Sequence, residues 1–221
     1  MTEAQIRVLL VDDHQVLREG LRLLLEGEAD MVVVSEAGTG QDAIRLALEL
    51  HPDVIVMDLG LPDGSGIDVI QEIHSQEPSM RFVVLSMYSD RELVMKALEA
   101  GSDGYVPKSS AHSDLLQAIR VVHAGQRYLH PIAATAVVTE MLDKQEESQL
   151  LEILSDREAQ VLRFTAMGFT SRDIGDRLSL SPKTVDTYRQ RAMNKLELEN
   201  RADLIRFALR AGLLDDADKE G

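Results

Sequence analysis

The sequence has no cysteine and no long apolar run. Without cysteine the chain can form neither a disulfide framework nor a thiolate metal site, which fits a reducing compartment. No stretch approaches the roughly 18 consecutive apolar residues that a membrane-spanning helix needs. Nothing before Ile6 resembles a charged segment followed by the apolar core of an export signal. We therefore expect a cytoplasmic protein with no role in a membrane.

Basic residues are scarce in the first part of the chain but not in the second. The formal net charge of −15, read as one number, argues against binding to nucleic acid. Residues 1–149 hold 25 acidic and 11 basic side chains, whereas residues 150–214 hold 9 acidic and 11 basic ones. These charges are −14 and +2, and the acidic tail 215–221 adds −3. The contrast indicates two domains with different partners, for which 221 residues suffice.

Short buried strands alternate with amphipathic helices through residues 1–124. Apolar, β-branched runs predict strands, and a helical spacing of apolar side chains predicts the helices between them. The predicted strands lie near residues 6–11, 31–36, 53–57, 81–86 and 103–106. The predicted helices lie near residues 15–27, 40–50, 64–76, 90–99 and 111–124. Five such units predict an α/β domain with a doubly wound parallel sheet, (βα)5.

A linker and an all-α domain are expected after the α/β domain. Residues 125–149 form the linker, with a predicted amphipathic helix over 132–142 and a solvated polar stretch over 143–149. Four helices are predicted in residues 150–214, each with an N-cap side chain before it. The caps are Ser155, Thr170, Ser181 and Asn200, supported by Glu158, Asp173, Pro182 and Asp203. Only three residues separate the helices at 171–178 and 182–196, which predicts a helix-turn-helix.

Polar residues follow four of the predicted strands at the point where each strand ends. They are Asp12 and Asp13, Asp58, Ser86 and Lys108. Taken singly, the carboxylates fit helix caps or turns, the lysine fits an exposed surface, and the serine carries no signal. The carboxyl ends of parallel strands, however, meet at one edge of a sheet, where open α/β sheets build their sites. Three carboxylates, a hydroxyl and an ammonium gathered there predict a divalent-metal and phosphoryl site.

The motifs at these strand ends resemble the receiver domain of bacterial two-component response regulators. They read Val-Asp12-Asp13-His14, Met57-Asp58-Leu-Gly-Leu-Pro62, Ser86 and Gly104-Tyr105-Val-Pro107-Lys108. Residues 154–214 resemble the LuxR-type helix-turn-helix, with Leu-Ser-Asp-Arg-Glu, Ser181-Pro-Lys-Thr-Val-Asp-Thr-Tyr-Arg and Asn200-Arg-Ala. The pairing is that of the NarL/FixJ family, and it covers nearly the whole chain apart from the linker and the tail.

The resemblance implies which residues accept the phosphoryl group and bind Mg²⁺. Asp58 would be the phosphoacceptor. Asp13 and Asp58 would be direct ligands of Mg²⁺, Asp12 would bind it through water, and the Gly60 carbonyl would be a further ligand. The metal would offset charge on the transferring oxygens, as phosphoryl transfer requires.

The resemblance also implies residues that contact and protect the phosphoryl group. Ser86 would donate to a phosphoryl oxygen, and Lys108 would pair with the group. The rotamer of Tyr105 would report the phosphorylation state. Gly60 and Tyr88 would flank the approach of a hydrolytic water. One departure is the serine at position 86, where the family more often has threonine.

The helix predicted at 182–196 has one apolar and one polar face. Val185, Ala192 and Leu196 share the apolar face, which we expect in the core. The polar face is a plausible surface for the major groove of DNA. The candidate DNA contacts are Lys183, Thr184, Asp186, Thr187, Tyr188, Gln190, Arg191, Asn194 and Lys195. An open alternative is an all-helical module that docks on proteins and whose polar face is only solvated.

The leading hypothesis is a transcription regulator whose DNA affinity is set by phosphorylation of Asp58. The expected partners are a sensor histidine kinase, double-stranded promoter DNA, RNA polymerase and a second copy of the chain. We expect no turnover of an external substrate, so the protein is not expected to be an enzyme. One competing hypothesis is an aspartyl-phosphate hydrolase of the haloacid dehalogenase type, which requires an aspartate where Gly60 stands. Another is an output domain that binds only proteins.

The first predicted helix carries more leucines than one core-facing stripe needs. Leu21, Leu23, Leu24 and Leu25 span much of its circumference, and Leu116 lies beside the core face of the helix at 111–124. Spare apolar surface on these helices predicts a two-fold interface that forms on phosphorylation. The open alternative is that all these leucines are buried.

Overall fold

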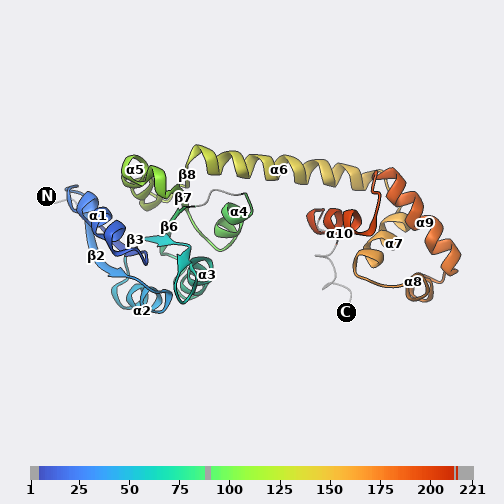
Figure 1. The fold of residues 1–221 in the computed structure, drawn as a ribbon, viewed down its shortest axis with the longest axis horizontal. Coiled ribbons are helices and arrows are strands. Elements are labelled where there is room, and N and C mark those ends of the chain that lie inside the picture. Colours follow the sequence, from blue (N-terminus) through green and yellow to red (C-terminus); the bar gives the residue numbers. More distant parts are fainter. Residues whose placement is uncertain (1–4, 88–90, 212, 214–221) are drawn as a thin grey trace. The chain divides into compact units, whose positions relative to one another are not determined.

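The computed structural model describes residues 5–87, 91–211 and 213 (Figure 1). The chain divides into two compact units, Met1–Val138 and Thr139–Gly221. In the described residues, the first unit contains strands and helices and the second contains helices alone. None of the described helices combines the length and the apolar character that crossing a bilayer requires. The acidic tail lies outside the described residues.

Six strands form one parallel sheet in the first unit. Their order is β2 (Met31–Ala37), β1 (Ile6–Val11), β3 (Val54–Asp58), β6 (Arg81–Ser86), β7 (Gly104–Pro107) and β8 (Tyr128–Leu129). Every neighbouring pair is parallel. The chain enters beside one edge, moves to that edge, and then crosses back toward the other, as a doubly wound sheet does. The predicted α/β fold and its five strands are confirmed.

A sixth strand and a small hairpin were not predicted. β8 pairs with Gly104 and Tyr105 of β7, and it extends the sheet into the segment that the sequence assigns to a linker. β4 (Gly60–Leu61) and β5 (Gly64–Ser65) form an antiparallel pair directly after β3. Strands of two residues carry no measurable periodicity, so the hydrophobic pattern does not reveal them.

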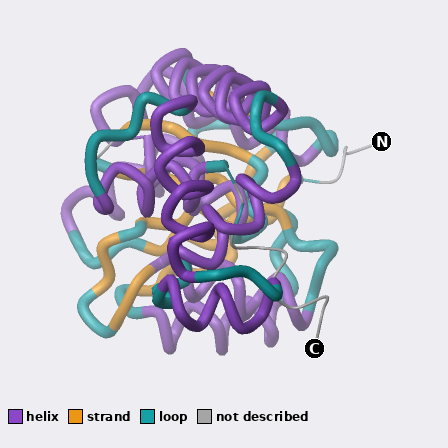
Figure 2. The backbone as a smooth tube through the Cα atoms, turned by 90° about the vertical axis from the view of Figure 1, so that its right-hand side faces the viewer, coloured by secondary structure: helices purple, strands orange, loops and turns teal. Residues whose placement is uncertain are grey.

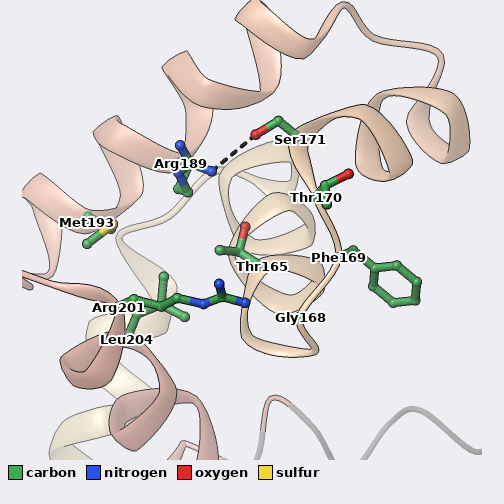
Figure 3. Close-up of a pocket in the computed structure, with 9 residues that line it drawn as sticks. All are labelled: Thr165, Gly168, Phe169, Thr170, Ser171, Arg189, Met193, Arg201 and Leu204. Carbon is green, nitrogen blue, oxygen red and sulfur yellow. Dashed lines mark hydrogen bonds between the residues drawn. The ribbon is translucent and has the colours of Figure 1, made fainter.

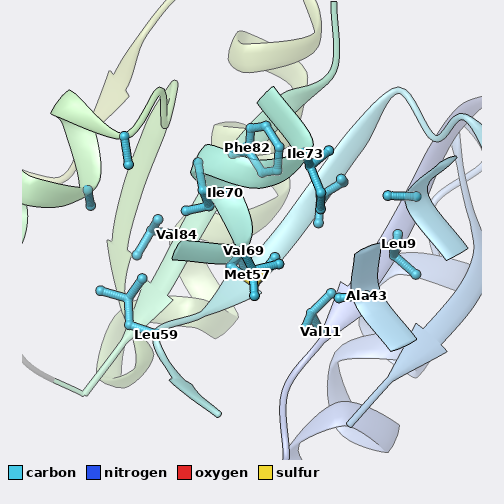
Figure 4. Packing of buried hydrophobic residues seen from close by; sticks show 14 of the residues in the cluster. Leu9, Val11, Ala43, Met57, Leu59, Val69, Ile70, Ile73, Phe82 and Val84 are labelled. Atoms are coloured by element: carbon cyan, nitrogen blue, oxygen red, sulfur yellow. The ribbon is translucent and has the colours of Figure 1, made fainter. Parts of the chain in front are cut away.

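Helices cover both faces of the sheet, which explains why its central strands are apolar along most of their length. The helices are α1 (Gln15–Glu26), α2 (Gly40–Leu50), α3 (Gly66–Gln76), α4 (Arg91–Glu99) and α5 (Ala111–His123). Side chains of α1 and α5 pack against Val8 and Val56 on one face. Side chains of α2, α3 and α4 pack against Leu9, Met57 and Phe82 on the other (Figure 4). In Figure 2 the strands of this unit are orange and the helices purple. Burial on both faces is typical of parallel sheets.

The segment after β8 is more helical than the sequence analysis predicts. α6 spans Pro131–Glu152, so the helix predicted over 132–142 continues through the polar stretch at 143–149. Glutamate, glutamine and lysine dominate that stretch, and all three have good intrinsic helix propensity. Polarity alone does not distinguish a solvated helix from a loop. The start of α6 belongs to the first unit, where Ala133 is fully buried in the core.

Four further helices form the second unit, as predicted. They are α7 (Asp156–Ala166), α8 (Ser171–Leu178), α9 (Pro182–Lys195) and α10 (Arg201–Arg210). All four predicted caps accept from main-chain N–H groups of the first turn. Between α8 and α9, Ser179 takes a left-handed conformation with φ of 56°. A Cβ atom at Gly175 would lie 2.6 Å from the Leu180 oxygen, so the turn packs tightly against α8.

A buried carboxylate joins α7 to α9 in the second unit. Glu158 is 4% exposed, and its Oε2 accepts from the Ser155 N–H and lies 2.6 Å from Lys195 Nζ. The ammonium of Lys195, helped by that N–H, lowers the pKa of Glu158 from the usual 4.5 to about 2. A lowered pKa means that the pair stabilises the folded unit fully above about pH 4.5. That stabilisation is lost as the pH falls toward 2.

The substitution Lys195→Met tests this pair. We expect it to lower the free energy of unfolding at pH 7 by roughly 1 to 3 kcal/mol, because a buried carboxylate loses a charged partner. The difference from the wild type should shrink between pH 4.5 and pH 2. Urea unfolding of the full chain, followed by nuclear magnetic resonance signals of the second unit, measures both. Lys183→Met is the control on the same helix. A difference that stays constant with pH would contradict the assignment.

Candidate functional site

Four neighbouring strands bring the predicted polar residues together at one edge of the sheet. Asp12 follows β1, Asp58 ends β3, Ser86 ends β6 and Lys108 follows β7. Asp12, Asp58 and Ser86 are each at most 5% exposed. A pocket of about 560 Å³ opens over Asp58 and Ser86. It is lined by His14, Asp58, Leu59, Gly60, Ser86, Met87, Leu93 and Lys108.

The ammonium of Lys108 lies between two carboxylates. Lys108 Nζ is 2.7 Å from Asp58 Oδ2, to which it donates, and 2.7 Å from Asp12 Oδ2. Burial lowers the pKa of Lys108, but the two carboxylates outweigh burial and leave that pKa raised, so the ammonium stays charged. Burial raises the pKa of Asp58, and Lys108 offsets this only in part. The raised pKa of Lys108 thus comes from its two carboxylate neighbours, whereas that of Asp58 comes first from burial.

The donor set at this edge suits a hard divalent cation. One ligand atom from each of Asp12, Asp13, His14 and Asp58 lies within 4.8 Å of the others. Asp12 Oδ2 is buried and, despite its contact with Lys108, makes no hydrogen bond of normal geometry. Receiver-like acidic pockets of this kind supply the carboxylate oxygens that Mg²⁺ prefers. The residues therefore fit a magnesium site, because Lys108 neutralises only part of the negative charge of these carboxylates.

His14 takes part in this cluster although the sequence analysis gave it no role. Its Nδ1 is 2.6 Å from Asp13 Oδ1 and 3.1 Å from Asp12 Oδ1. Its main-chain N–H donates to Asp12 Oδ1. The only signal in the sequence is its position beside the two aspartates. Because it directly precedes α1, its side chain turns back over the strand end.

Gly60, Tyr105 and Tyr88 are the remaining residues predicted for this site. The Gly60 N–H donates to Asp58 Oδ1 at 3.3 Å. Tyr105 is fully buried in the core on β7. A Cβ atom at Gly66, the first residue of α3, would lie 2.1 Å from the main-chain oxygen of Asp58. Only glycine therefore allows α3 to start directly behind β3. Tyr88 lies outside the described residues.

The second unit presents the predicted DNA-reading face on α9. Val185, Ala192 and Leu196 are buried, as predicted. The exposed side chains are Lys183, Asp186, Thr187, Gln190, Arg191, Asn194 and Lys195, and Thr184 and Tyr188 are half-buried. Two charged members have structural partners. Lys195 contacts Glu158 of α7, and Asp186 lies 2.8 Å from Arg189 Nη2 and accepts from the Ser171 hydroxyl of α8.

A second pocket, of about 460 Å³, lies along one flank of α9 (Figure 3). Its lining includes Thr170, Ser171, Arg189, Met193 and Arg201. Arg189 donates to the Ser171 hydroxyl, which is the dashed contact in Figure 3. The guanidinium of Arg201, from the start of α10, points across the pocket toward Gly168. The flank of α9 that carries Arg189 and Met193 is next to the face that carries Gln190.

Comparisons with known proteins match both parts of the chain. The family model for the response regulator receiver domain matches residues 8–120, and that for bacterial regulatory proteins of the luxR family matches residues 152–208. The response regulator GacA of Pseudomonas aeruginosa is 35% identical over 212 residues, which cover 96% of this chain and 99% of GacA.

Solved structures of response regulators are similar over the same span. The RcsB response regulator of Salmonella typhimurium is 28% identical, with a TM-score of 0.62, and the match covers 94% of this chain and 99% of that one. A structure of two RcsB dimers bound to two parallel DNAs is 28% identical, with a TM-score of 0.56. Its match covers 93% of this chain and 98% of that chain.

Fold, site and comparisons agree along the sequence. The acidic edge and strands β2, β3, β6 and β7 fall within the receiver match, which β1 overlaps and β8 follows, and the helix-turn-helix falls within the luxR match. The relatives contain both parts over nearly their full length. This chain therefore belongs to the NarL/FixJ family of two-component response regulators, which regulate transcription through a receiver domain and a LuxR-type DNA-binding domain.

Proposed function

We propose that Asp58 is the phosphoacceptor and that its phosphorylation controls DNA binding by α9. The observation that carries this proposal is the contact of Lys108 with Asp58 in a pocket that Ser86 also lines, with the buried Asp12 on the other side of Lys108. Asp58 is the carboxylate of this group that is in reach of both Lys108 and the open pocket. The phosphoryl donor would be a phosphohistidine of a sensor kinase, as the receiver domain implies.

The proposed chemistry is a single phosphoryl transfer to Asp58. An Asp58 carboxylate oxygen forms a bond to phosphorus while the bond from phosphorus to the donor nitrogen breaks, and that nitrogen keeps the electron pair. Lys108 and the Ser86 hydroxyl would contact the transferred oxygens. Mg²⁺, held by Asp13, Asp58, the Gly60 carbonyl and, through water, Asp12, would offset their negative charge. Tyr105 would adjust its rotamer when Ser86 engages the phosphoryl group.

An enzyme that turns over external phosphate esters is disfavoured. A hydrolase of the haloacid dehalogenase type needs a carboxylate two residues after its nucleophile, and Gly60 has no side chain there. We propose that the protein transfers a phosphoryl group to itself alone. Because the proposed target is promoter DNA, we also propose a cytoplasmic location. Contact with RNA polymerase stays a prediction.

Asp58→Asn tests the phosphoacceptor. Incubation of the wild type with Mg²⁺ and a small acyl phosphate should add one phosphoryl group, seen as a mass increase in the intact protein. The variant should take up none, because an amide is not a nucleophile toward phosphorus. Asp68→Asn, at an exposed carboxylate on α3, is the matched control and should be labelled like the wild type. Full labelling of Asp58→Asn would refute the assignment.

We propose that phosphorylation favours a homodimer through α1, next to α5. Leu21 and Leu25 are buried in the core, so two of the four leucines noted on this helix are not available for an interface. Leu23 is 66% exposed and Val16, on the same helix, is 84% exposed. Leu116 packs against the core of its own domain and is only half-buried. The related RcsB forms dimers on DNA, which supports a dimeric active state here.

Leu23→Glu tests the proposed interface. A charge on the exposed side of α1 should raise the dimer dissociation constant of the phosphorylated protein by at least about tenfold, or about 1.4 kcal/mol. Sedimentation at micromolar concentration measures the mass in solution. Leu209→Glu places the same charge on a comparably exposed leucine of the DNA-binding domain. If phosphorylated Leu23→Glu dimerises as well as the wild type, α1 is not the interface.

We propose that α9 enters the major groove and that Gln190 and Thr187 contact base edges. Gln190 can bond an adenine edge in two places, and the Thr187 methyl group fits a thymine methyl. Lys183 and Arg191 would supply positive charge for contacts with the phosphate backbone of the DNA. Arg201 would contact a phosphate on the flank of α9, because its guanidinium faces the open pocket there. Lys195 is less suited to this role, since Glu158 holds its ammonium.

Two substitutions separate base reading from backbone contact. Gln190→Ala should weaken binding to the cognate site by roughly 1 to 3 kcal/mol and leave the affinity for random duplex DNA unchanged. Arg201→Ala should weaken both and reduce the dependence of log affinity on log salt concentration by about 1. Arg206→Ala is the control, because this exposed arginine of α10 pairs with Asp203. Equal losses on cognate and random duplex for Gln190→Ala would show that it does not read bases.

A further inference from the structure

Arg18 joins three parts of the receiver domain beside the acidic pair. Its Nε donates to Glu36 Oε2 of β2 at 2.9 Å, and its Nη1 donates to the main-chain oxygen of Asp12. The side chains of Arg18 and Glu36 are 18% and 28% exposed, so the contact is partly shielded from water. The helix α1, the strand β2 and the end of β1 meet at this one guanidinium.

The oxygen that Arg18 contacts belongs to the peptide bond between Asp12 and Asp13. The N–H of Asp12 belongs to the preceding peptide, and the Ala37 oxygen of β2 holds it at 3.1 Å. With the Asp12 oxygen held by Arg18, the two planar peptides on either side of the Asp12 Cα are both held. This fixes φ and ψ of Asp12, and with them the direction of the Asp12 side chain and the position of the Asp13 Cα.

The carboxylate of Glu36 holds the guanidinium in place. A planar guanidinium bonds two acceptors from a rigid fork of donors, whereas the three donors of an ammonium rotate on a flexible stem. Arg22, one turn further along α1, also contacts Glu36, with its Nε 3.2 Å from Oε1. Arg22 thus shares the carboxylate but has no contact with the Asp12–Asp13 peptide among the described interactions. The two arginines form a natural pair for comparison.

We propose that Arg18 is a positioning residue that sets the geometry of the Asp12 and Asp13 carboxylates for Mg²⁺. This inference rests on the proposed magnesium site. Groups that orient metal ligands without touching the metal typically change metal affinity by 10- to 100-fold when they are removed. Arg18 holds the main chain of the ligands and so acts on both carboxylates together.

Charge and positioning predict opposite effects for Arg18, which makes the test sharp. Arg18 carries a positive charge near a proposed cation site, so its removal should strengthen Mg²⁺ binding if charge alone matters. Loss of positioning should weaken it. Arg22→Ala removes the same charge from the same helix and the same carboxylate partner, but leaves the peptide contact intact.

The experiment is calorimetric titration of Mg²⁺ into the full chain without a phosphoryl donor. We expect the dissociation constant to rise about tenfold in Arg18→Ala and to stay within about twofold of the wild type in Arg22→Ala. Arg18→Lys, which keeps the charge, should lie between Arg18→Ala and the wild type. The rise in unfolding temperature that Mg²⁺ produces should shrink in the same order. If Arg18→Ala does not fold, Arg18→Lys carries the comparison.

Each other result has a defined meaning. Wild-type affinity or tighter binding in Arg18→Ala, with Mg²⁺ bound normally by the wild type, overturns the role of Arg18 alone. Equal weakening in Arg18→Ala and Arg22→Ala also overturns it, since the peptide contact would then not matter. A wild type that binds no Mg²⁺ overturns the proposed magnesium site together with this inference.

Discussion

One ammonium between two buried carboxylates holds the functional edge of the receiver domain together. Lys108 contacts Asp12 and Asp58, and these three residues lie at the ends of β1, β3 and β7, within a run of four neighbouring strands. Removing one partner of such a buried group commonly costs about 3 to 5 kcal/mol, because the remaining charge is left uncompensated. A charged group added at Asp58 therefore changes the balance of charge around Lys108.

The ionic contacts of the DNA-binding domain limit the charge that α9 offers to DNA. Lys195 is held by Glu158 and Arg189 by Asp186, so neither ammonium nor guanidinium is fully available to phosphates. Lys183 and Arg191 have no ion pair among the described interactions and remain on the exposed face. A helix with so few available cations contributes little non-specific affinity. Joining two copies raises affinity through effective concentration, which is why dimerisation is a reasonable point of control.

The sequence predicts the parallel sheet and the polar cluster well, because both follow from where apolar runs stop. Asp12, Asp58, Ser86 and Lys108 each end or follow a long, buried strand, and parallel order alone brings them together. The helix caps are equally local, since each depends on residues within one turn. β8 was not predicted, because it forms by pairing with β7 and its two residues are too few to show an alternating pattern.

Contacts between distant side chains account for most of what could not be predicted. Spacing along α9 places Lys195 near the polar face, but only the fold brings it to Glu158, 37 residues earlier. Arg18 likewise meets Glu36 because α1 packs beside β2, and a helical pattern does not identify an arginine that contacts a main-chain oxygen. The same holds for His14, whose ring direction depends on where α1 begins. Sequence patterns give the position of a residue on an element and not the direction of its side chain.

We propose that phosphorylation of Asp58 sets the affinity of the DNA-binding domain for promoter DNA. This dependence is measured by footprinting of promoter DNA by the full chain, with Mg²⁺ and in the presence and absence of a phosphoryl donor. We expect protection of specific sites to appear, or to strengthen severalfold, only with the donor, and the protected half-sites to be spaced for a dimer. Identical protection with and without the donor, at a confirmed level of phosphorylation, would refute this role of Asp58.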